Sequence, residues 1–339
     1  MKISELGEFA LIERIAARLP TYRQDVRAAV GDDVAVLGWD DDHYQLATCD
    51  IQVEGVHFQQ ESITAFQLGR RALAINLSDI AAKGGTPEHL LVSLAVRPDL
   101  EVEWVEELYD GLGQEASRYG MDIVGGNLSR TEGPIVVDIF LLGKVARQEV
   151  LLRSGAQPGD LVLVTGYLGE AAAGRAVLAG MVSGLSQEER RRLVAAHLTP
   201  TPRLREGQAI ARSRLATAML DLSDGLGSDI GHLCDQSGVG VRLWAERLPI
   251  SPAARDLAQS VGREVWELAL GGGEDYELCL TVPPDRERGV AQAVESETGT
   301  PVTCVGEILK KAAGRHLVLP GGEEVPLASL GWDHFQSGG

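Results

Sequence analysis

The spacing of apolar residues in the first half of the chain changes repeatedly between the helical and the strand period. Residues 8–19 place Phe9, Ile12 and Ile15 three positions apart, which predicts a helix that ends before Pro20. Residues 65–83 predict a longer helix, which ends at Gly84-Gly85-Thr86-Pro87. The pattern also predicts a helix at 102–119 and strands at 28–37, 44–53, 90–96, 121–126 and 135–145.

Residues 152–159 interrupt this alternation with Gly, Ser and Pro, which predicts a linker. Beyond it, the spacing predicts strands at 160–165, 218–222, 278–282, 303–308 and 316–319, and helices at 171–179, 188–197, 228–237 and 287–298. Strands that alternate with helices indicate sheets covered by helices. We therefore predict an α/β (α+β) chain of two mixed domains, residues 1–150 and 151–339, joined near residue 150.

Composition narrows the class of protein. The 339 residues are 44% apolar and 24% charged, which is an ordinary globular composition, and they exceed the usual length of one domain. The 31 basic and 49 acidic residues give a net charge of −18. This charge disfavours nucleic acids and anionic membranes as partners, because their phosphates repel an acidic surface. Phosphate-bearing ligands remain compatible when divalent cations accompany them.

The cysteines and the N-terminus favour a reducing, cytoplasmic environment. The cysteines are scattered and form no C-x-x-C pair, unlike a disulfide framework: Cys49, Cys234, Cys279 and Cys304. The first residues show no basic segment followed by an apolar stretch, so no signal peptide is expected. The longest apolar runs have the length of strands, well below the ~20 residues of a membrane-spanning helix.

Several carboxylates follow or interrupt apolar elements in the first half of the chain. Gly31-Asp32-Asp33 and Asp50 lie beside predicted strands, where they are either turn residues or metal ligands. Asp79 falls on the apolar face of the helix at 65–83. A carboxylate on a packed face is costly unless it is paired or bound to metal, so Asp79 is either a metal ligand or the partner of Lys83, four residues on.

The second half of the chain carries the string Asp221-Leu222-Ser223-Asp224-Gly225-Leu226, in which an apolar strand ends in two carboxylates and a hydroxyl. An N-cap role would explain either Ser223 or Asp224 and leave the other carboxylate unexplained. An EF-hand is excluded, because its sixth position requires Gly and its twelfth requires Glu. A second string, Gly271-Gly272-Gly273-Glu274-Asp275, combines glycines that permit close backbone approach with acidic residues.

The motifs of several other enzyme classes are missing from the sequence. It contains no G-x-x-x-x-G-K-[ST], no H-E-x-x-H and no G-x-S-x-G, and its one dinucleotide-like turn has the wrong spacing. The candidate carboxylates come from both halves of the chain: Asp33, Asp50, Asp79, Asp221 and Asp224. Hard divalent cations take oxygen ligands, so this set predicts a site for several Mg²⁺ ions and a nucleotide between the two domains.

At these same positions the sequence resembles the thiamine-monophosphate kinases, a family related to aminoimidazole ribonucleotide synthetase and selenophosphate synthetase. The matching strings run in family order over nearly the whole chain. They are Gly7-Glu8-Phe9, Gly31-Asp32-Asp33, Asp50, Val53-Glu54-Gly55-Val56-His57-Phe58, the segment 72–82, Gly125-Gly126, Arg153-Ser154-Gly155-Ala156, the segment 221–226, the segment 272–277 and Gly331-Trp332-Asp333-His334-Phe335.

The resemblance implies ATP-dependent phosphorylation of thiamine monophosphate to thiamine diphosphate by direct, Mg²⁺-assisted transfer, in a cytoplasmic homodimer paired through its N-terminal domains. It assigns Mg²⁺ to Asp33, Asp50, Asp79, Asn127, Asp221 and Asp224. It assigns ATP to Thr48, Gly126, Asn127, Arg153 and Ser223, and thiamine monophosphate to His57, Glu274 and Trp332. No residue acts as acid or base.

Two residues depart from the family pattern. Asn127 stands where the family usually has a metal-binding Asp, so its amide oxygen brings no charge. Cys49 stands where the family usually has a hydroxyl residue, and a thiol is a poor donor to phosphate. The alternatives are another ATP-dependent enzyme of the same superfamily and a non-catalytic protein that binds Mg-nucleotide.

Overall fold

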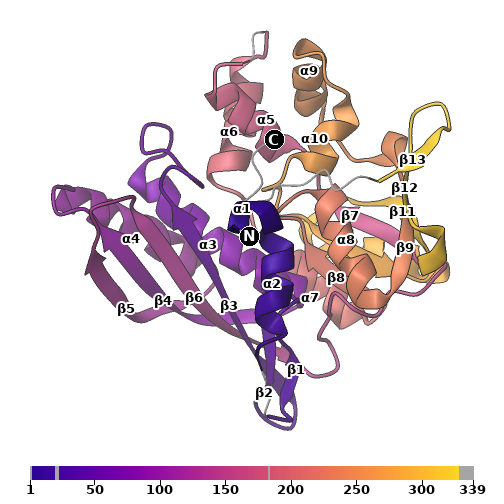
Figure 1. Cartoon of the computed structure of the whole chain (residues 1–339), viewed down its shortest axis with the longest axis horizontal. Coiled ribbons are helices and arrows are strands. Elements are labelled where there is room, and N and C mark those ends of the chain that lie inside the picture. The colour runs from indigo at the N-terminus through magenta and orange to yellow at the C-terminus, as the bar shows by residue number, and fades with distance from the viewer. Residues whose placement is uncertain (1, 20–22, 182–183, 328–339) are drawn as a thin grey trace.

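The computed structural model describes residues 2–19, 23–181 and 184–327, and these form two β-sheets with helices packed against them (Figure 1). The sheet built from the first half of the chain lies to the left in Figure 1, and the sheet built from the second half lies to the right. The short helices α1 (Ile3–Leu6) and α2 (Glu8–Ala16) lie between them. Two mixed sheets covered by helices confirm the predicted fold class.

The N-terminal sheet has the strand order β1-β2-β3-β6-β4-β5, and all neighbours are antiparallel except β4 and β5. Helices α3 (Ala65–Ala82) and α4 (Val102–Arg118) pack on each other, and α3 also packs on the sheet. The strands are β1 (Val26–Ala28), β2 (Ala35–Gly38), β3 (His43–Val53), β4 (Thr86–Val96), β5 (Asp122–Arg130) and β6 (Val136–Ala146).

Two strands of this sheet differ from the prediction. The single strand expected at 28–37 is two short strands, β1 and β2, separated by the turn that contains Gly31 and the two aspartates after it. The strand expected to end at Gly126 continues to Arg130. Its Gly126 packs so tightly on β4 that an added Cβ would lie 2.0 Å from the carbonyl oxygen of Val92. The predicted linker at 152–159 contains no helix or strand.

The C-terminal sheet has the order β13-β12-β9-β11-β7-β10-β8, antiparallel except for β12 and β9. Its strands are β7 (Leu161–Thr165), β8 (Ala218–Asp221), β9 (Val239–Trp244), β10 (Leu278–Val282), β11 (Val302–Lys310), β12 (Arg315–Val318) and β13 (Glu324–Pro326). The helices of this half are α5 (Glu170–Leu178), α6 (Gln187–Leu198), α7 (Leu204–Ser213), α8 (Leu226–Ser237), α9 (Pro252–Ser260), α10 (Val265–Gly271) and α11 (Glu287–Thr298).

The apolar core is continuous across the junction of the two sheets. Ile210 of α7 and Val290 of α11 belong to the same buried cluster as Leu77 of α3 and Leu280 of β10. A second cluster fills the outer part of the C-terminal half. Apolar packing at the junction therefore fixes the elements that carry the acidic residues of the two halves relative to each other.

The described residues bear on membrane-spanning helices and on disulfide bonds. No helix among them has both the length and the apolar character needed to cross a bilayer. All four cysteines lie in the described ranges and none forms a disulfide.

Candidate active site

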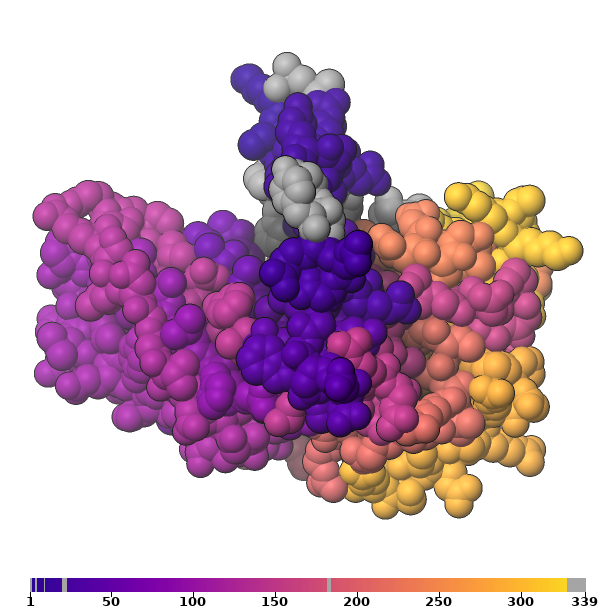
Figure 2. Space-filling model, turned by 90° about the horizontal axis from the view of Figure 1, so that it is seen from below, coloured from indigo at the N-terminus to yellow at the C-terminus, as the bar shows by residue number. Residues whose placement is uncertain are grey.

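A cavity of about 1090 Å³ opens between the two sheets. Its N-terminal wall comes from the β1–β2 turn, β3 and α3, and its C-terminal wall comes from the β8–α8 loop, α8 and the glycine-rich segment 272–276. Glu8, Ile12 and Glu13 of helix α2 line its rim. Figure 2 shows this N-terminal region, in indigo, projecting between the two halves of the molecule.

Strand pairing brings two sequence motifs together at one edge of the C-terminal sheet. Asp221, the last residue of β8, pairs with Leu278 at the start of β10. The pairing continues into the loops, because the Tyr276 amide donates to the Leu222 carbonyl at 2.9 Å. Gly225 has φ +108°, and a Cβ there would lie 2.7 Å from the Leu270 carbonyl oxygen, so this crossing of the two loops requires glycine.

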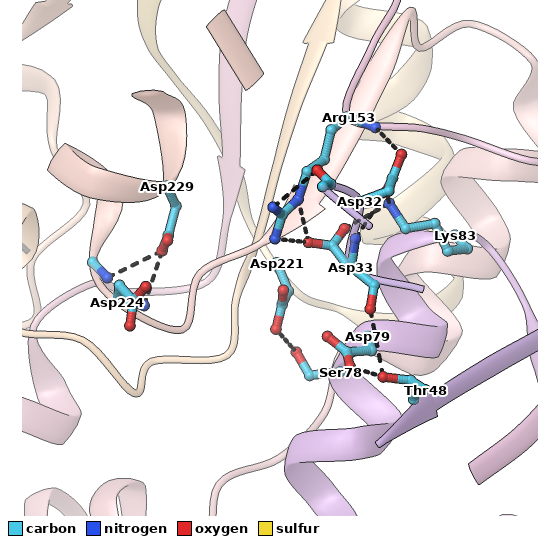
Figure 3. Close-up of polar contacts among 12 residues, drawn as sticks. Asp32, Asp33, Thr48, Ser78, Asp79, Lys83, Arg153, Asp221, Asp224 and Asp229 are labelled. Carbon is cyan, nitrogen blue, oxygen red and sulfur yellow. Dashed lines mark hydrogen bonds and ion pairs between the residues drawn. The ribbon is translucent and has the colours of Figure 1, made fainter. Parts of the chain in front are cut away.

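Three of the predicted metal ligands converge in this cavity. One carboxylate oxygen each from Asp33, Asp79 and Asp221 lies within 4.8 Å of the others. Figure 3 shows these side chains directed toward one another from the β1–β2 turn, α3 and the end of β8. The Ser78 hydroxyl donates to Asp221 at 2.7 Å, and the Thr48 hydroxyl donates to Asp79.

The electrostatics of this group are those of a crowded acidic cluster. Burial and the charge of Asp33 raise the pKa of Asp221 to about 7. Burial, Asp138 and Asp33 raise the pKa of Asp50 to about 6. Burial and three neighbouring carboxylates raise the pKa of Asp79 well above its ordinary value. Each of these shifts means that the ionised form lacks compensating positive charge.

Asp33 differs from the other three because two cations contact it. Burial alone would raise its pKa, but Arg153 and Lys83 outweigh burial and lower it. The Arg153 Nε donates to Asp33 Oδ1 at 2.5 Å, and Lys83 Nζ lies 2.5 Å from Asp33 Oδ2. Lys83 Nζ also lies 2.5 Å from Asp32 Oδ1, so Lys83 pairs with the β1–β2 turn and not with Asp79. The sequence pattern placed Asp32 in a candidate string without giving it a role of its own, and the pairing of Lys83 with Asp79 that it allowed is wrong.

The fifth predicted aspartate, Asp224, lies in a second group with Asp229 and His232 of helix α8, whose ligand atoms also lie within 4.8 Å of one another. Neither Ser223 nor Asp224 is the N-cap of α8, because the helix begins after Gly225. Asp229 accepts the amides of Asp224 and Gly225 at 3.1 and 3.0 Å. Asp229 and His232 were not predicted as site residues. Their positions three and six residues after Leu226 place them on one face of the helix that follows the Asp221–Leu226 string, and this spacing could have identified them.

The residues expected to contact thiamine monophosphate lie on two sides of the cavity. His57 lines it beyond the end of β3, and its Nδ1 accepts the Val53 amide at 3.0 Å, which leaves the proton on Nε2. Glu274 has φ +65° and pairs with Arg71 and with His197 Nδ1 at 3.1 Å. Arg71 is almost fully buried, and nothing in the sequence pattern marked it.

The other residues singled out in the sequence lie apart from the acidic cluster or outside the described residues. Gly126 and Asn127 lie on β5, an exposed edge strand, and do not line the cavity. Cys49 lines the cavity but lies on the face of β3 opposite to Thr48 and Asp50, because side chains alternate along a strand. Trp332 lies outside the described residues.

The donor set fits hard divalent cations. Asp33, Asp79 and Asp221 supply carboxylate oxygens from three separate elements, which is the ligand type that Mg²⁺ takes in proteins. Asp33 Oδ2 is already paired with the Lys83 ammonium group at 2.5 Å, whereas Asp79 and Asp221 make no ion pair with a lysine or arginine in the described part of the chain. Buried carboxylates without such a partner are costly unless a cation satisfies them.

Comparison with known proteins identifies the family. Residues 31–145 match the family model "AIR synthase related protein, N-terminal domain", and residues 157–318 match "AIR synthase related protein, C-terminal domain". Thiamine-monophosphate kinase of Salmonella typhimurium is 38% identical over 329 residues, which cover 97% of this chain and 98% of that protein. The chain belongs to the thiamine-monophosphate kinase family. The family resemblance read from the sequence is thereby confirmed.

Other members of the thiamine-monophosphate kinase family agree in length and fold. The Aquifex aeolicus enzyme is 34% identical over 339 residues, 99% of this chain and 100% of that protein. A solved structure described as AaThiL complexed with AMPPCP and TMP has a TM-score of 0.84 at 34% identity, covering 98% of this chain and 99% of that one. The HypE–HypF complex, at 18% identity and a TM-score of 0.72, shares the fold alone.

Proposed function

We infer that this chain transfers the γ-phosphoryl group of ATP to thiamine monophosphate, giving thiamine diphosphate and ADP. The likeness to thiamine-monophosphate kinases extends over the full length of the chain, and one similar structure is described as a complex with AMPPCP and TMP. The observation that carries the proposal is the cluster of Asp33, Asp79 and Asp221, whose carboxylate oxygens meet in the cavity between the two sheets.

The chemistry of the acceptor explains why the site needs no general base. A phosphate monoester has a second pKa of about 6 and is largely a dianion at neutral pH, so its oxygen attacks without losing a proton to the protein. The main obstacle is repulsion between two polyanions, and catalysis reduces to positioning and charge neutralisation. When bound, Mg²⁺ supplies the positive charge that lets the two phosphates approach.

We propose that Asp33, Asp50, Asp79, Asp221 and Asp224 hold Mg²⁺ at this site. Thr48, Arg153 and Ser223 line the same cavity and contact ATP in this proposal. Arg153 pairs with Asp33 in the structure, so its guanidinium lies next to the place where the triphosphate would be neutralised.

For thiamine monophosphate, the proposed contacts are His57, Glu274 and Trp332. The proton on His57 Nε2 allows this ring to donate a hydrogen bond to the acceptor phosphate. Arg71 and His197 hold Glu274 at the cavity wall, which fixes its carboxylate for the cationic part of the substrate. An indole ring at Trp332 suits a thiazolium cation, because aromatic faces attract positive charge.

We also propose that the chain forms a homodimer through its N-terminal sheet. The strand register places Ile51, Leu91 and Phe140 on the sheet face opposite to α3, and all three are exposed. Exposed large apolar residues on one face of a sheet are typical of an interface. Asn127 lies beside Ser93 on the same face, so its proposed contacts with metal and ATP require a partner subunit whose cavity reaches this face.

The domain limits, 1–150 and 151–339, and the cytoplasmic location remain proposals. The change from one sheet to the other falls between β6 and β7, on either side of the predicted linker, which supports the boundary.

The direct test is an ADP-release assay with ATP, Mg²⁺ and thiamine monophosphate, run beside thiamine and aminoimidazole precursors. The proposal predicts turnover with thiamine monophosphate alone. Release with an aminoimidazole precursor would indicate another enzyme of the superfamily. Binding of Mg-ATP without turnover on any of these acceptors would indicate a non-catalytic nucleotide-binding protein.

A further inference from the structure

Lys83 is an unusual residue for its position. It follows the last residue of α3 and is fully buried, with 0% of its side chain exposed. Its Nζ lies 2.5 Å from Asp32 Oδ1 and 2.5 Å from Asp33 Oδ2, as the group at the right of Figure 3 shows. A buried ammonium group is costly unless carboxylates compensate it, and these two do so from both sides.

The contacts of Asp32 explain what this cation holds in place. Asp32 Oδ1 also accepts the Asp33 amide at 2.9 Å, and Asp32 Oδ2 accepts the Arg153 amide at 3.3 Å. Asp32 therefore joins three elements: the end of α3 through Lys83, its own β1–β2 turn, and the linker that begins the second half of the chain. The same helix end carries Asp79, one turn before Lys83.

We propose that the Lys83 ammonium group is a built-in cation of the acidic site, which neutralises the Asp32–Asp33 pair and occupies a place that a metal ion would otherwise take. Lys83 is thus a positioning residue, which fixes Asp33 next to Asp79 and Asp221 before divalent ions bind. This proposal rests on the proposed function for the identity of the metal site. It adds that this pair of aspartates is already compensated in the metal-free protein.

The charges around the pair support this role. Lys83 Nζ lies between Asp32 and Asp33, 2.5 Å from a carboxylate oxygen of each. Asp79 and Asp221 have no comparable lysine contact among the described residues, although a carboxylate oxygen of each lies within 4.8 Å of one from Asp33. The side of the site formed by Asp79 and Asp221 is therefore the side that lacks a built-in cation.

The test compares thermal unfolding of the full chain in EDTA and in saturating Mg²⁺, for wild type, Lys83→Met and Lys144→Met. Lys144 is the matched control, because it pairs with Glu88 at 2.6 Å but is exposed. Lys83→Met should lower the melting temperature in EDTA by about 5–10 °C, since one member of a buried ion pair is lost. Saturating Mg²⁺ should recover at least half of that loss, and Lys144→Met should match wild type in both buffers.

If Lys83→Met lowers the melting temperature by the same amount in EDTA and in Mg²⁺, Lys83 only fills space. If it does not lower the melting temperature in EDTA, Lys83 does not compensate the charges of Asp32 and Asp33. Either result overturns the proposal. If Lys83→Met yields no folded protein in EDTA, the double variant Asp32→Asn/Lys83→Met is compared with it. Recovery of folding supports charge compensation, and continued failure overturns it. Kinase activity does not enter this comparison, so its outcome is separate from that of the proposed function.

Discussion

Replacing Asp221 by Asn should stabilise the metal-free protein while it abolishes phosphoryl transfer. Asp221 is 4% exposed, and its pKa is raised from 3.8 to about 7 by burial and by Asp33. Each unit of pKa shift corresponds to about 1.4 kcal/mol, so the ionised side chain destabilises the fold by at most about 4 kcal/mol. Asn keeps an oxygen for the Ser78 hydroxyl, which donates to Asp221 at 2.7 Å, and removes the charge.

The pH dependence of this effect follows from the direction of the shift. A carboxyl group with a raised pKa in the folded state has no effect on stability below its unfolded pKa of 3.8. The destabilisation grows as the pH rises toward about 7 and is then constant. The variant should therefore exceed wild type by about 2–4 kcal/mol near pH 8, or on the order of 3–8 °C in melting temperature, and the difference should vanish near pH 4.

The assay is thermal unfolding in EDTA at several pH values, repeated in saturating Mg²⁺. In saturating Mg²⁺ the wild type should have the higher melting temperature, because it is stabilised by bound Mg²⁺ that the variant binds poorly. Asp256→Asn is the control, since Asp256 is an exposed residue of α9. ADP release should fall at least about 100-fold in Asp221→Asn and remain unchanged in the control. Lower stability than wild type in EDTA near pH 8 would show that the Asp221 charge does not destabilise the fold, and activity within a few-fold of wild type would show that Asp221 does not hold Mg²⁺.

Three further predictions concern the rest of the site and the interface. The Mg²⁺ concentration that half-saturates the protein should rise as the pH falls from about 8 to about 6, because Asp50 and Asp221 must lose protons to bind metal. Isothermal titration calorimetry that gives the same half-saturating concentration at both pH values would contradict this. Trp332→Ala should raise the KM for thiamine monophosphate about 2- to 30-fold without changing the melting temperature; a lower melting temperature with unchanged KM would show a packing role. Phe140→Asp should convert a dimer to a monomer in size-exclusion chromatography with light scattering, and a wild-type monomer would contradict the interface.

Local pattern was sufficient for the long elements that carry the site. The helix predicted at 65–83 is α3 (Ala65–Ala82), because its apolar spacing is regular and Gly84 ends it with φ +67°. The strand predicted at 44–53 is β3 (His43–Val53), whose alternation of buried and exposed residues is clear. The elements α1, α7, β9, α9, α10 and β13 were not predicted. The apolar pattern of α1 and β13 is too brief to stand out from the connecting segments, whereas α7 and α9 are at least as long as the predicted helix α5 and were overlooked.

The carboxylates were predictable from the sequence as a set, and their partners were not. Asp33, Asp79 and Asp221 stand at the ends of elements or on an apolar face, where a carboxylate needs a reason to be present. Lys83 and Arg71 look like ordinary helical residues until the fold brings Asp33 and Glu274 to them. Which cation contacts which carboxylate depends on packing between distant segments, and no local spacing encodes it.

The same limit explains Gly126 and Asn127. The resemblance assigns Gly126 to ATP, and in the structure Gly126 permits close packing of β5 on β4. The proposed contact of Asn127 with metal runs across the proposed dimer interface, and no local spacing in the sequence encodes such a contact.

Following the γ-phosphate of ATP shows whether this chain phosphorylates thiamine monophosphate. The chain is incubated with Mg²⁺, thiamine monophosphate and ATP labelled at the γ-phosphorus, and the products are separated. We expect the label to appear in thiamine diphosphate in a one-to-one ratio with ADP, and we expect Asp221→Asn or EDTA to abolish this transfer. Label recovered only as unreacted ATP, or only as inorganic phosphate, in the presence of folded wild-type protein would contradict this expectation.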